Sequence, residues 1–292
     1  MPMKIGIGPC YFRSTDGTFD YDAGALRMLS HGYRHLDFDW YANTENELYA
    51  GDTEEEFIQN TLKWKEKLTK HGLIVHQVHG PWCGDIHDKT PEGRAERFEK
   101  MSKCLQAASL LGARYMAIHP IMPFGSNSPD HPERLYEMNY EFFTRLADVA
   151  ERYGTVICLE NMPFTNFPLA SVPSLLALIR DIGRDNVRMC LDTGHANIFP
   201  LPLGDCVRLI GKEDLKILHV HDNMGVQDEH LHPYCGTADF DGFSDALEQI
   251  GFDGVVNLEC SVRPTSYHTH EQRVERELAL AERVKRIAKG ST

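Results

Sequence analysis

Eight short apolar runs recur along the chain, with room for a helix between consecutive runs. A run of four to six apolar residues is typical of a strand that is buried on both faces of a sheet. We expect the following segments to form strands: Lys4–Gly8, His35–Asp39, Ile74–His79, Tyr115–His119, Val156–Glu160, Val187–Asp192, Leu215–His219 and Gly254–Glu259.

Between these runs, apolar residues recur with helical periodicity. The pattern predicts helices over Glu54–His71, Pro91–Leu111 and His131–Tyr153. Gly72, Gly112 and Gly154 follow these segments directly, and glycine is the preferred residue just past a helix end. Strands that alternate with helices indicate right-handed crossovers and a parallel sheet.

Eight strand–helix units in 292 residues predict a single (β/α)₈ barrel, and we expect one domain over residues 1–292. An open, doubly wound parallel sheet is the alternative architecture. It is disfavoured because no glycine-rich dinucleotide-binding sequence follows the first strand, Lys4–Gly8.

An acidic or histidine residue ends each of the last four predicted strands: Glu160, Asp192, His219 and Glu259. Such a side chain is costly at the end of a buried strand unless it has a partner. The carboxyl ends of all barrel strands meet at one mouth, so a single divalent ion bound by these four residues is the simplest explanation.

Five further groups are expected near the same mouth. His79 and His119 end the third and fourth strands, His195 follows Asp192 closely, and Asp228 and His230 lie in the loop after the seventh strand. Each histidine alone is typical of a side chain bonded to backbone. Together they are candidate ligands for additional ions. His221 shares the strand face of His219, and its role is left open.

The ligand types indicate which ions would suit the site. Imidazole and carboxylate without thiolate favour Zn²⁺, Mn²⁺ or Co²⁺. The set of two glutamates, one aspartate and one histidine favours Mn²⁺ or Mg²⁺. The additional histidines favour zinc and allow more than one ion.

Composition narrows the function classes. The formal net charge of −13 disfavours binding to duplex DNA or to anionic membranes. No apolar stretch approaches the roughly 20 residues that span a bilayer, and the first residues lack the basic and apolar blocks that are typical of a signal peptide. The eight cysteines contain no Cys-x-x-Cys pair, which favours reduced thiols and a cytoplasmic protein. The sequence leaves open whether the chain forms a homo-oligomer.

Several of these segments resemble the xylose-isomerase-like TIM-barrel superfamily, over nearly the whole chain. The matching pieces are VHGPW, AIHP, LEN, MCLDTGH, LHVHDN, DEHLHPYCGTADF and NLE. The last third is most similar to the sugar phosphate isomerase/epimerase branch, in which an aspartate and an aromatic residue lead into the seventh helix, as Asp239 and Phe240 would here.

The resemblance implies roles for individual residues. One divalent ion would be held by Glu160, Asp192, His219 and Glu259, with the two glutamates also acting as acid and base, and His195 would contact the sugar. His219 is favoured over His221 because the motif places the ligand histidine three residues before an aspartate, here Asp222.

The same superfamily contains dehydratases and the endonuclease IV nucleases, which remain alternatives. In the nuclease branch two more zinc ions are bound by groups that resemble His79, His119, His195, Asp228 and His230. The chain departs from the nuclease motifs at two places, because D-T-C-H is replaced by D-T-G-H and H-x-N-D by H-V-H-D.

We therefore expect a metal-dependent isomerase or epimerase that acts on a small polyhydroxy carbonyl compound through an enediolate. A barrel that binds a metal or ligand without catalysis is the remaining hypothesis. Beside His195, the expected substrate-binding residues are His79, His119, Trp82 and Arg263, and the aromatic side chains of Trp40, Trp82 and Phe124 are expected to line the pocket.

Overall fold

The computed structural model describes residues 2–12, 18–39, 53–81, 88–260 and 270–289. Eight strands pair in parallel in the order β7-β6-β5-β4-β3-β2-β1-β8. Val220, just after β7, bridges to Leu258 of β8 and closes the ring. The strands are β1 (Lys4–Ile7), β2 (His35–Asp39), β3 (Ile74–His79), β4 (Tyr115–Ile118), β5 (Val156–Glu160), β6 (Val187–Asp192), β7 (Leu215–His219) and β8 (Val255–Leu258).

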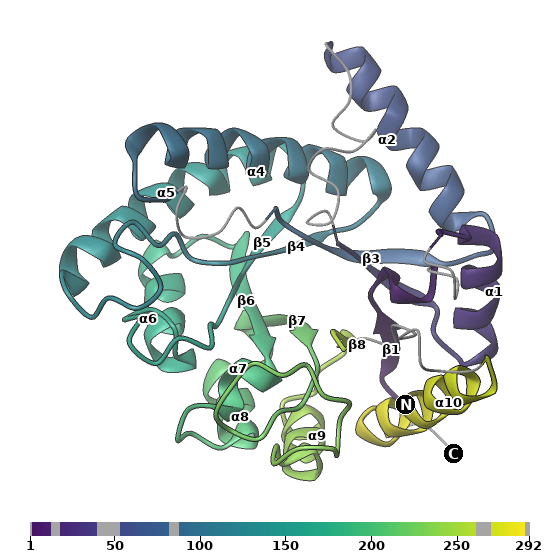
Figure 1. Cartoon of the computed structure of the whole chain (residues 1–292). Helices are drawn as coiled ribbons and strands as arrows, with labels where there is room; N and C mark the ends of the chain where they lie inside the picture. The colour runs from purple at the N-terminus through teal and green to yellow at the C-terminus, as the bar shows by residue number, and fades with distance from the viewer. Residues whose placement is uncertain (1, 13–17, 40–52, 82–87, 261–269, 290–292) are drawn as a thin grey trace.

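Helices surround this ring, as Figure 1 shows, so the predicted (β/α)₈ barrel is confirmed. The described helices are the short η1 (Pro9–Phe12), α1 (Tyr21–Ser30), α2 (Glu54–Thr69), α4 (Pro91–Leu111), α5 (Pro132–Tyr153), α6 (Val172–Ile182), α7 (Thr193–Asn197), α8 (Leu203–Asp214), α9 (Phe240–Gln249) and α10 (His270–Ile287).

The predicted boundaries hold to within two residues. Five strands have the expected bounds. β1 and β4 are shorter by one residue at the C-terminal end and β8 by one residue at each end, so His119 and Glu259 lie just past their strands. Gly112 and Gly154 cap α4 and α5 with positive φ, as expected. The expected cap at Gly72 is wrong, because α2 ends at Thr69 with Lys70 as its cap.

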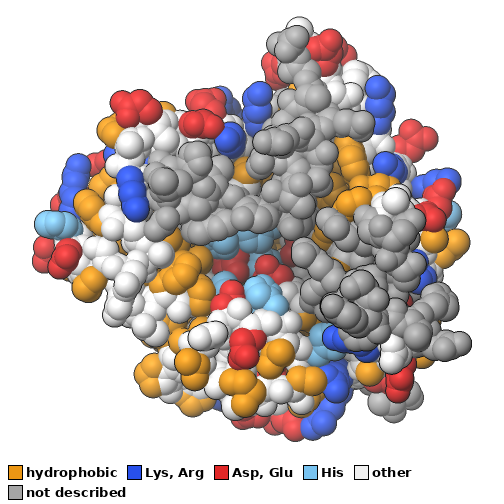
Figure 2. Space-filling model, in the orientation of Figure 1, with side chains coloured by type: hydrophobic (Ala, Val, Ile, Leu, Met, Phe, Trp, Pro, Cys, Tyr) orange, Lys and Arg blue, Asp and Glu red, His pale blue; other side chains and the backbone are white. Residues whose placement is uncertain are grey.

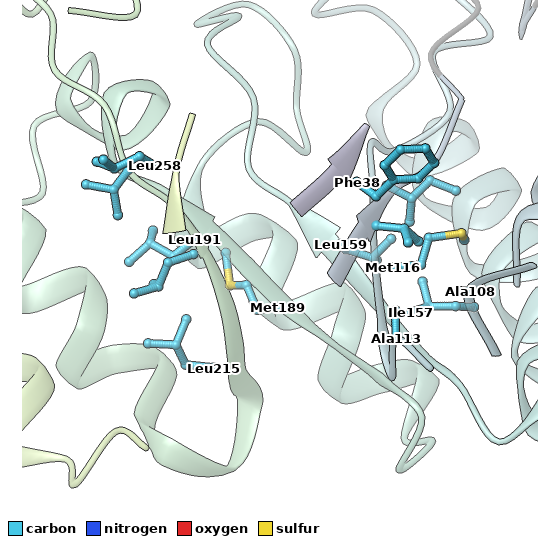
Figure 3. Packing of buried hydrophobic residues seen from close by; sticks show 14 of the residues in the cluster. Phe38, Ala108, Ala113, Met116, Ile157, Leu159, Met189, Leu191, Leu215 and Leu258 are labelled. Carbon is cyan, nitrogen blue, oxygen red and sulfur yellow. The ribbon is translucent and has the colours of Figure 1, made fainter. Parts of the chain in front are cut away.

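The main hydrophobic core lies between the strands and the helices. Outward-facing side chains of the strands, including Phe38, Met116, Ile157, Leu191 and Leu258, are almost completely buried there (Figure 3). Burial of this apolar layer supplies the main driving force for folding. The described cysteines are free thiols, as expected. Among the described helices, none combines the length and hydropathy needed to cross a bilayer.

The interior of the barrel differs between its two sides. The β4–β7 side is apolar and packs Ala117, Val156, Cys158, Cys190 and Ile217 together. The opposite side buries three polar residues, Asp37 of β2, Gln77 of β3 and Asn257 of β8. Buried polar groups need hydrogen-bond partners, so this side of the interior is a polar network rather than a packed apolar layer.

We predict that His76 destabilises the barrel in acid. Its ring lies between those of His35 and Tyr115, with centroids 5.9 and 5.5 Å away, and its Nε2 makes no hydrogen bond. Burial lowers the pKa of His76 to about 4. The unfolded chain therefore binds a proton, between about pH 6.5 and 4, that the folded chain excludes, and stability falls as pH falls through that window.

Urea unfolding at pH 7 and pH 4.5 tests this prediction. Wild type should lose about 2 kcal/mol through this histidine, and His76→Gln should lose correspondingly less over the same interval. An identical pH dependence in the two proteins would contradict it. The acidic groups of the barrel mouth also lose stabilising interactions in acid, in both proteins. The contribution of His76 is therefore the difference between the losses of wild type and His76→Gln.

Candidate metal centre and active site

The ends of four neighbouring strands bring together the four predicted ligands. One ligand atom from each of Glu160, Asp192, His219 and Glu259 lies within 4.8 Å of the others. Nδ1 of His219 lies 3.1 Å from Oε1 of Glu160 and 3.0 Å from Oε2 of Glu259. Figure 2 shows histidine and acidic side chains gathered in a hollow near the centre of this face.

Burial and opposite charge set the protonation of these groups. Burial alone would raise the pKa of Glu160, but His219 and His119 outweigh it and hold that pKa well below its usual value. The pKa of Glu259 is likewise lowered, chiefly by His219 acting against burial. Burial opposes protonation of His219, yet Cys190, Glu160, Glu259 and Asp37 raise its pKa well above the usual value. His219 thus lies between two carboxylates that both favour its charged form.

The donor set fits a divalent cation. Oε2 of Glu160, Oε2 of Glu259 and Nδ1 of His219 are buried and make no well-aligned hydrogen bond. Buried polar atoms without hydrogen bonds are costly, and a cation would satisfy all three together. Three carboxylates and one imidazole suit zinc, manganese or magnesium. Metal binding by these residues stays a prediction.

His79 and His119 both contact Oε2 of Glu160, whereas His219 contacts Oε1. The Nε2 atom of each ring is 3.4 Å from Oε2 of Glu160. Burial opposes protonation of both, but Glu160 raises the pKa of His79 to about 9, whereas burial prevails at His119 and lowers its pKa. His79, Glu160 and His219 also form a group with metal-ligand spacing.

Asp228 connects two of the other predicted histidines. Its Oδ2 lies 3.3 Å from Nε2 of His195 and 3.2 Å from Nε2 of His230. Burial opposes ionisation of all three. Asp192 and Asp228 nevertheless raise the pKa of His195 to about 10, Asp228 raises that of His230 to about 9, and the two imidazoles lower that of Asp228.

His221 lies between Asp192, one of the four predicted ligands, and His230, which contacts Asp228. Its Nε2 is 3.0 Å from Oδ2 of Asp192, and its ring stacks on His230 with centroids 4.1 Å apart. It belongs to two candidate ligand groups, one with Asp192 and His195 and one with His230 and Glu259, whereas His219 is the histidine of the four-residue group. The choice of His219 over His221 as the ligand of the four-residue group stays a prediction.

Gly194 makes room for His221. A Cβ atom at position 194 would lie 2.0 Å from Cε1 and 2.3 Å from Nδ1 of the His221 ring. Real side chains do not approach this closely, so residue 194 has to be glycine while the ring of His221 keeps its place.

Asp192 caps a helix, in addition to its expected role as a metal ligand. Its Oδ1 accepts a hydrogen bond from the backbone N–H of His195 at 2.6 Å and caps α7. Asn161 ties β5 to β6 by bonding both backbone groups of Asp192, at 2.9 and 3.0 Å. The helix cap uses Oδ1 alone, and Oδ2 of Asp192 contacts Nε2 of His221 at 3.0 Å.

The polar network beneath His219 was not predicted from the sequence. Oδ2 of Asp37 accepts hydrogen bonds from Nε2 of Gln77 at 2.9 Å and Nδ2 of Asn257 at 3.0 Å, and Nε2 of His219 lies 3.1 Å away. The available signal was a polar residue at an inward position in each of three apolar strands.

Three predicted substrate-site residues, Trp40, Trp82 and Arg263, lie outside the described residues. Phe124 is 36% exposed, and its ring lies beside His131 at the start of α5, with centroids 5.2 Å apart. Its expected place in the wall of a substrate pocket stays a prediction.

The fold and the mouth define a (β/α)₈ barrel protein with a cluster of imidazole and carboxylate groups at the ends of its strands. The chain belongs to the xylose isomerase-like TIM barrel family, whose model matches residues 27–287. An uncharacterized protein of Methanocaldococcus jannaschii is 32% identical over 208 residues, which cover 68% of each chain. The inosose isomerase of Bacillus subtilis is 24% identical over 188 residues, which cover 62% of this chain and 66% of that enzyme.

Solved structures share the architecture over nearly the full length. The D-psicose 3-epimerase of Clostridium cellulolyticum with D-tagatose superposes with a TM-score of 0.74 at 20% identity, covering 99% of this chain and 100% of that chain. The IolI protein with a bound zinc atom gives a TM-score of 0.71 at 18% identity, covering 98% of both chains. At these identities the similarity establishes the fold alone.

Proposed function

We propose that the protein is a divalent-metal-dependent isomerase or epimerase of a sugar or sugar phosphate. The main support is that Nδ1 of His219 lies 3.1 Å from a carboxylate oxygen of Glu160 and 3.0 Å from one of Glu259. Two carboxylates from different strands beside one cation site can exchange protons with a bound substrate from two directions. Relatives named inosose isomerase and D-psicose 3-epimerase support the substrate class.

Each residue at the barrel mouth would have its own role in the reaction. A divalent ion bound there would act as a Lewis acid that stabilises the negative charge of an enediolate. One glutamate removes the α-proton, and the other returns a proton at the neighbouring carbon or on the opposite face. The side chain of Glu259 is 32% exposed and can meet a substrate directly, whereas that of Glu160 is 1% exposed. His195 would hydrogen-bond a substrate oxygen through Nε2, and that bond would replace its contact with Oδ2 of Asp228 at 3.3 Å, because Nδ1 lies 2.7 Å from the backbone oxygen of Asn161.

The ion is proposed to be Mn²⁺ or Zn²⁺, with Mg²⁺ or Co²⁺ as the other suitable ions. The zinc atom bound by the IolI protein, which shares this fold, supports zinc. Anomalous scattering from crystals of the purified protein would identify the ion and count the occupied positions.

The reaction is tested by proton exchange. Metal-loaded protein is incubated in D₂O with inosose, D-psicose, D-tagatose and D-fructose, and NMR follows deuterium at the carbon next to the carbonyl. We expect exchange together with an isomeric product, and neither after chelation of the metal. Exchange followed by loss of water would identify a dehydratase instead. Sugar binding without exchange would contradict the enzymatic proposal.

Phosphodiester cleavage at abasic sites is the second candidate, and the two extra histidine groups favour it. His79 and His119 on Glu160, and His195 and His230 on Asp228, resemble ligands for further zinc ions. A probable endonuclease 4 of Shouchella clausii is 26% identical over 199 residues, which cover 63% of this chain and 66% of that protein.

For this second candidate we expect a negative result. A net charge of −13 opposes strong binding to abasic duplex DNA at physiological salt. Zinc-loaded protein should therefore leave an abasic duplex uncut in a gel assay. Strand incision that disappears in His79→Ala or His119→Ala would reverse the ranking of the two functions.

A further inference from the structure

The two ring nitrogens of His219 meet different partners. Nδ1 faces Glu160 and Glu259 at the barrel mouth, whereas Nε2 faces the interior and lies 3.1 Å from Oδ2 of Asp37. The contact with Asp37 has ion-pair distance without the alignment of a good hydrogen bond. Only one edge of the ring is therefore open to the candidate metal centre.

Asp37 is itself held in place from two other strands, β3 beside it and β8 on the far side of β1. Nε2 of Gln77 and Nδ2 of Asn257 donate to its Oδ2 at 2.9 and 3.0 Å. Asp37 is 5% exposed, Gln77 0% and Asn257 1%. Two amide donors that converge on one buried oxygen fix its position in front of Nε2 of His219.

Gly6 of β1 leaves space for this arrangement. A Cβ atom at position 6 would lie 2.8 Å from Oδ1 of Asn257 and 2.9 Å from a methyl group of Val255. Any larger residue would displace the amide that holds Asp37. Strands β1, β2, β3, β7 and β8 thus all contribute to the position of one imidazole.

We infer that Asp37 is a positioning residue that makes His219 bind the divalent ion through Nδ1. A histidine ligand is commonly oriented by a carboxylate on its other ring nitrogen, which sets the tautomer and strengthens the ligand. Asp37 touches neither the ion nor the substrate, and it acts only through His219. The inference rests on the metal site of the proposed function and is independent of which sugar reacts.

Metal affinity tests the inference without substrate. The affinity for Zn²⁺ is measured by competition with a chromophoric chelator in wild type, Asp37→Asn and Asp37→Ala. We expect a loss of about 10-fold for Asp37→Asn, which keeps the shape, and up to about 100-fold for Asp37→Ala. Wild-type affinity in both variants would overturn the inference.

Asn186→Ala is the matched control for general destabilisation. Asn186 precedes β6 at the opposite end of the barrel and donates to the backbone oxygen of Ala147 at 2.7 Å. Its loss should lower the melting temperature without changing zinc affinity. A similar loss of affinity in this control would mean that the Asp37 variants act through stability, which would overturn the inference.

NMR identifies which ring nitrogen of His219 binds the ion. In zinc-loaded protein with ¹⁵N-labelled histidine, long-range proton–nitrogen correlations should give Nδ1 of His219 bound and Nε2 protonated. Coordination through Nε2 would overturn the inference even if the affinities change as expected. Zinc binding with these features but without sugar turnover would contradict the proposed reaction alone, whereas absence of zinc binding in wild type would overturn both.

Discussion

Replacing either Glu160 or Glu259 by glutamine should reduce proton exchange by about 10²–10⁴-fold, the usual contribution of a positioned acid or base. Glutamine keeps a similar shape and an oxygen ligand but cannot accept a proton at neutral pH. In wild type the pKa of each carboxyl is lowered, against burial, with His219 the principal cause, so both are ionised at neutral pH. Each variant should retain metal, because three of the four ligands remain.

The measurement separates chemistry from metal binding. Each variant is saturated with Mn²⁺ or Zn²⁺, its occupancy is checked by elemental analysis, and deuterium incorporation is followed in D₂O. His195→Asn is the comparison, since it should mainly raise KM. Full exchange by both metal-loaded glutamine variants would show that neither carboxylate transfers the proton, and His221 and His230 would be the next residues to test.

Replacing Arg97 by methionine should destabilise the folded protein by about 3–5 kcal/mol, because it leaves a buried carboxylate unpaired. Arg97 is 2% exposed and forms an ion pair with Asp88, which is 0% exposed. Its Nη2 also donates to the backbone oxygen of His119 at 2.8 Å, and Oδ2 of Asp88 accepts from the backbone N–H of Met122 at 2.8 Å. The pair joins α4 to the loop after β4.

Urea unfolding at pH 7 measures this loss. Arg134→Met is the matched control, because Arg134 pairs with Glu137 on the surface and both side chains are 60% exposed. That variant should differ from wild type by about 0.5 kcal/mol or less. The double variant Arg97→Met/Asp88→Leu should recover part of the loss, since it removes the unpaired charge. Equal effects in Arg97→Met and Arg134→Met would contradict the prediction.

The sequence was sufficient to predict the fold because the strands of a parallel barrel are buried on both faces. Their apolar runs are continuous, and β2, β3, β5, β6 and β7 have the bounds that the runs predict. Asp239 also caps α9, which begins at Phe240, as the resemblance implied. Gly72 misled the helix prediction, since α2 ends before it reaches that glycine.

The candidate site was predictable where it depends on strand ends and unpredictable where it depends on contacts across the barrel. Strand ends place Glu160, Asp192, His219 and Glu259 at one mouth whatever the details of packing. The contact of Asp37 with His219 joins strands far apart in the sequence. Periodicity places each residue on a face, but it does not give the partner that the residue meets across the interior.

The space that Gly194 leaves for the ring of His221 has an evolutionary consequence. The two places where this chain departs from the nuclease motifs, D-T-G-H for D-T-C-H and H-V-H-D for H-x-N-D, are in contact in three dimensions. The ring of His221 cannot occupy its present place while position 194 carries a side chain. For a ring held in this place, a change from one motif to the other requires glycine at position 194 before or together with histidine at position 221, and the reverse change requires that His221 be lost first.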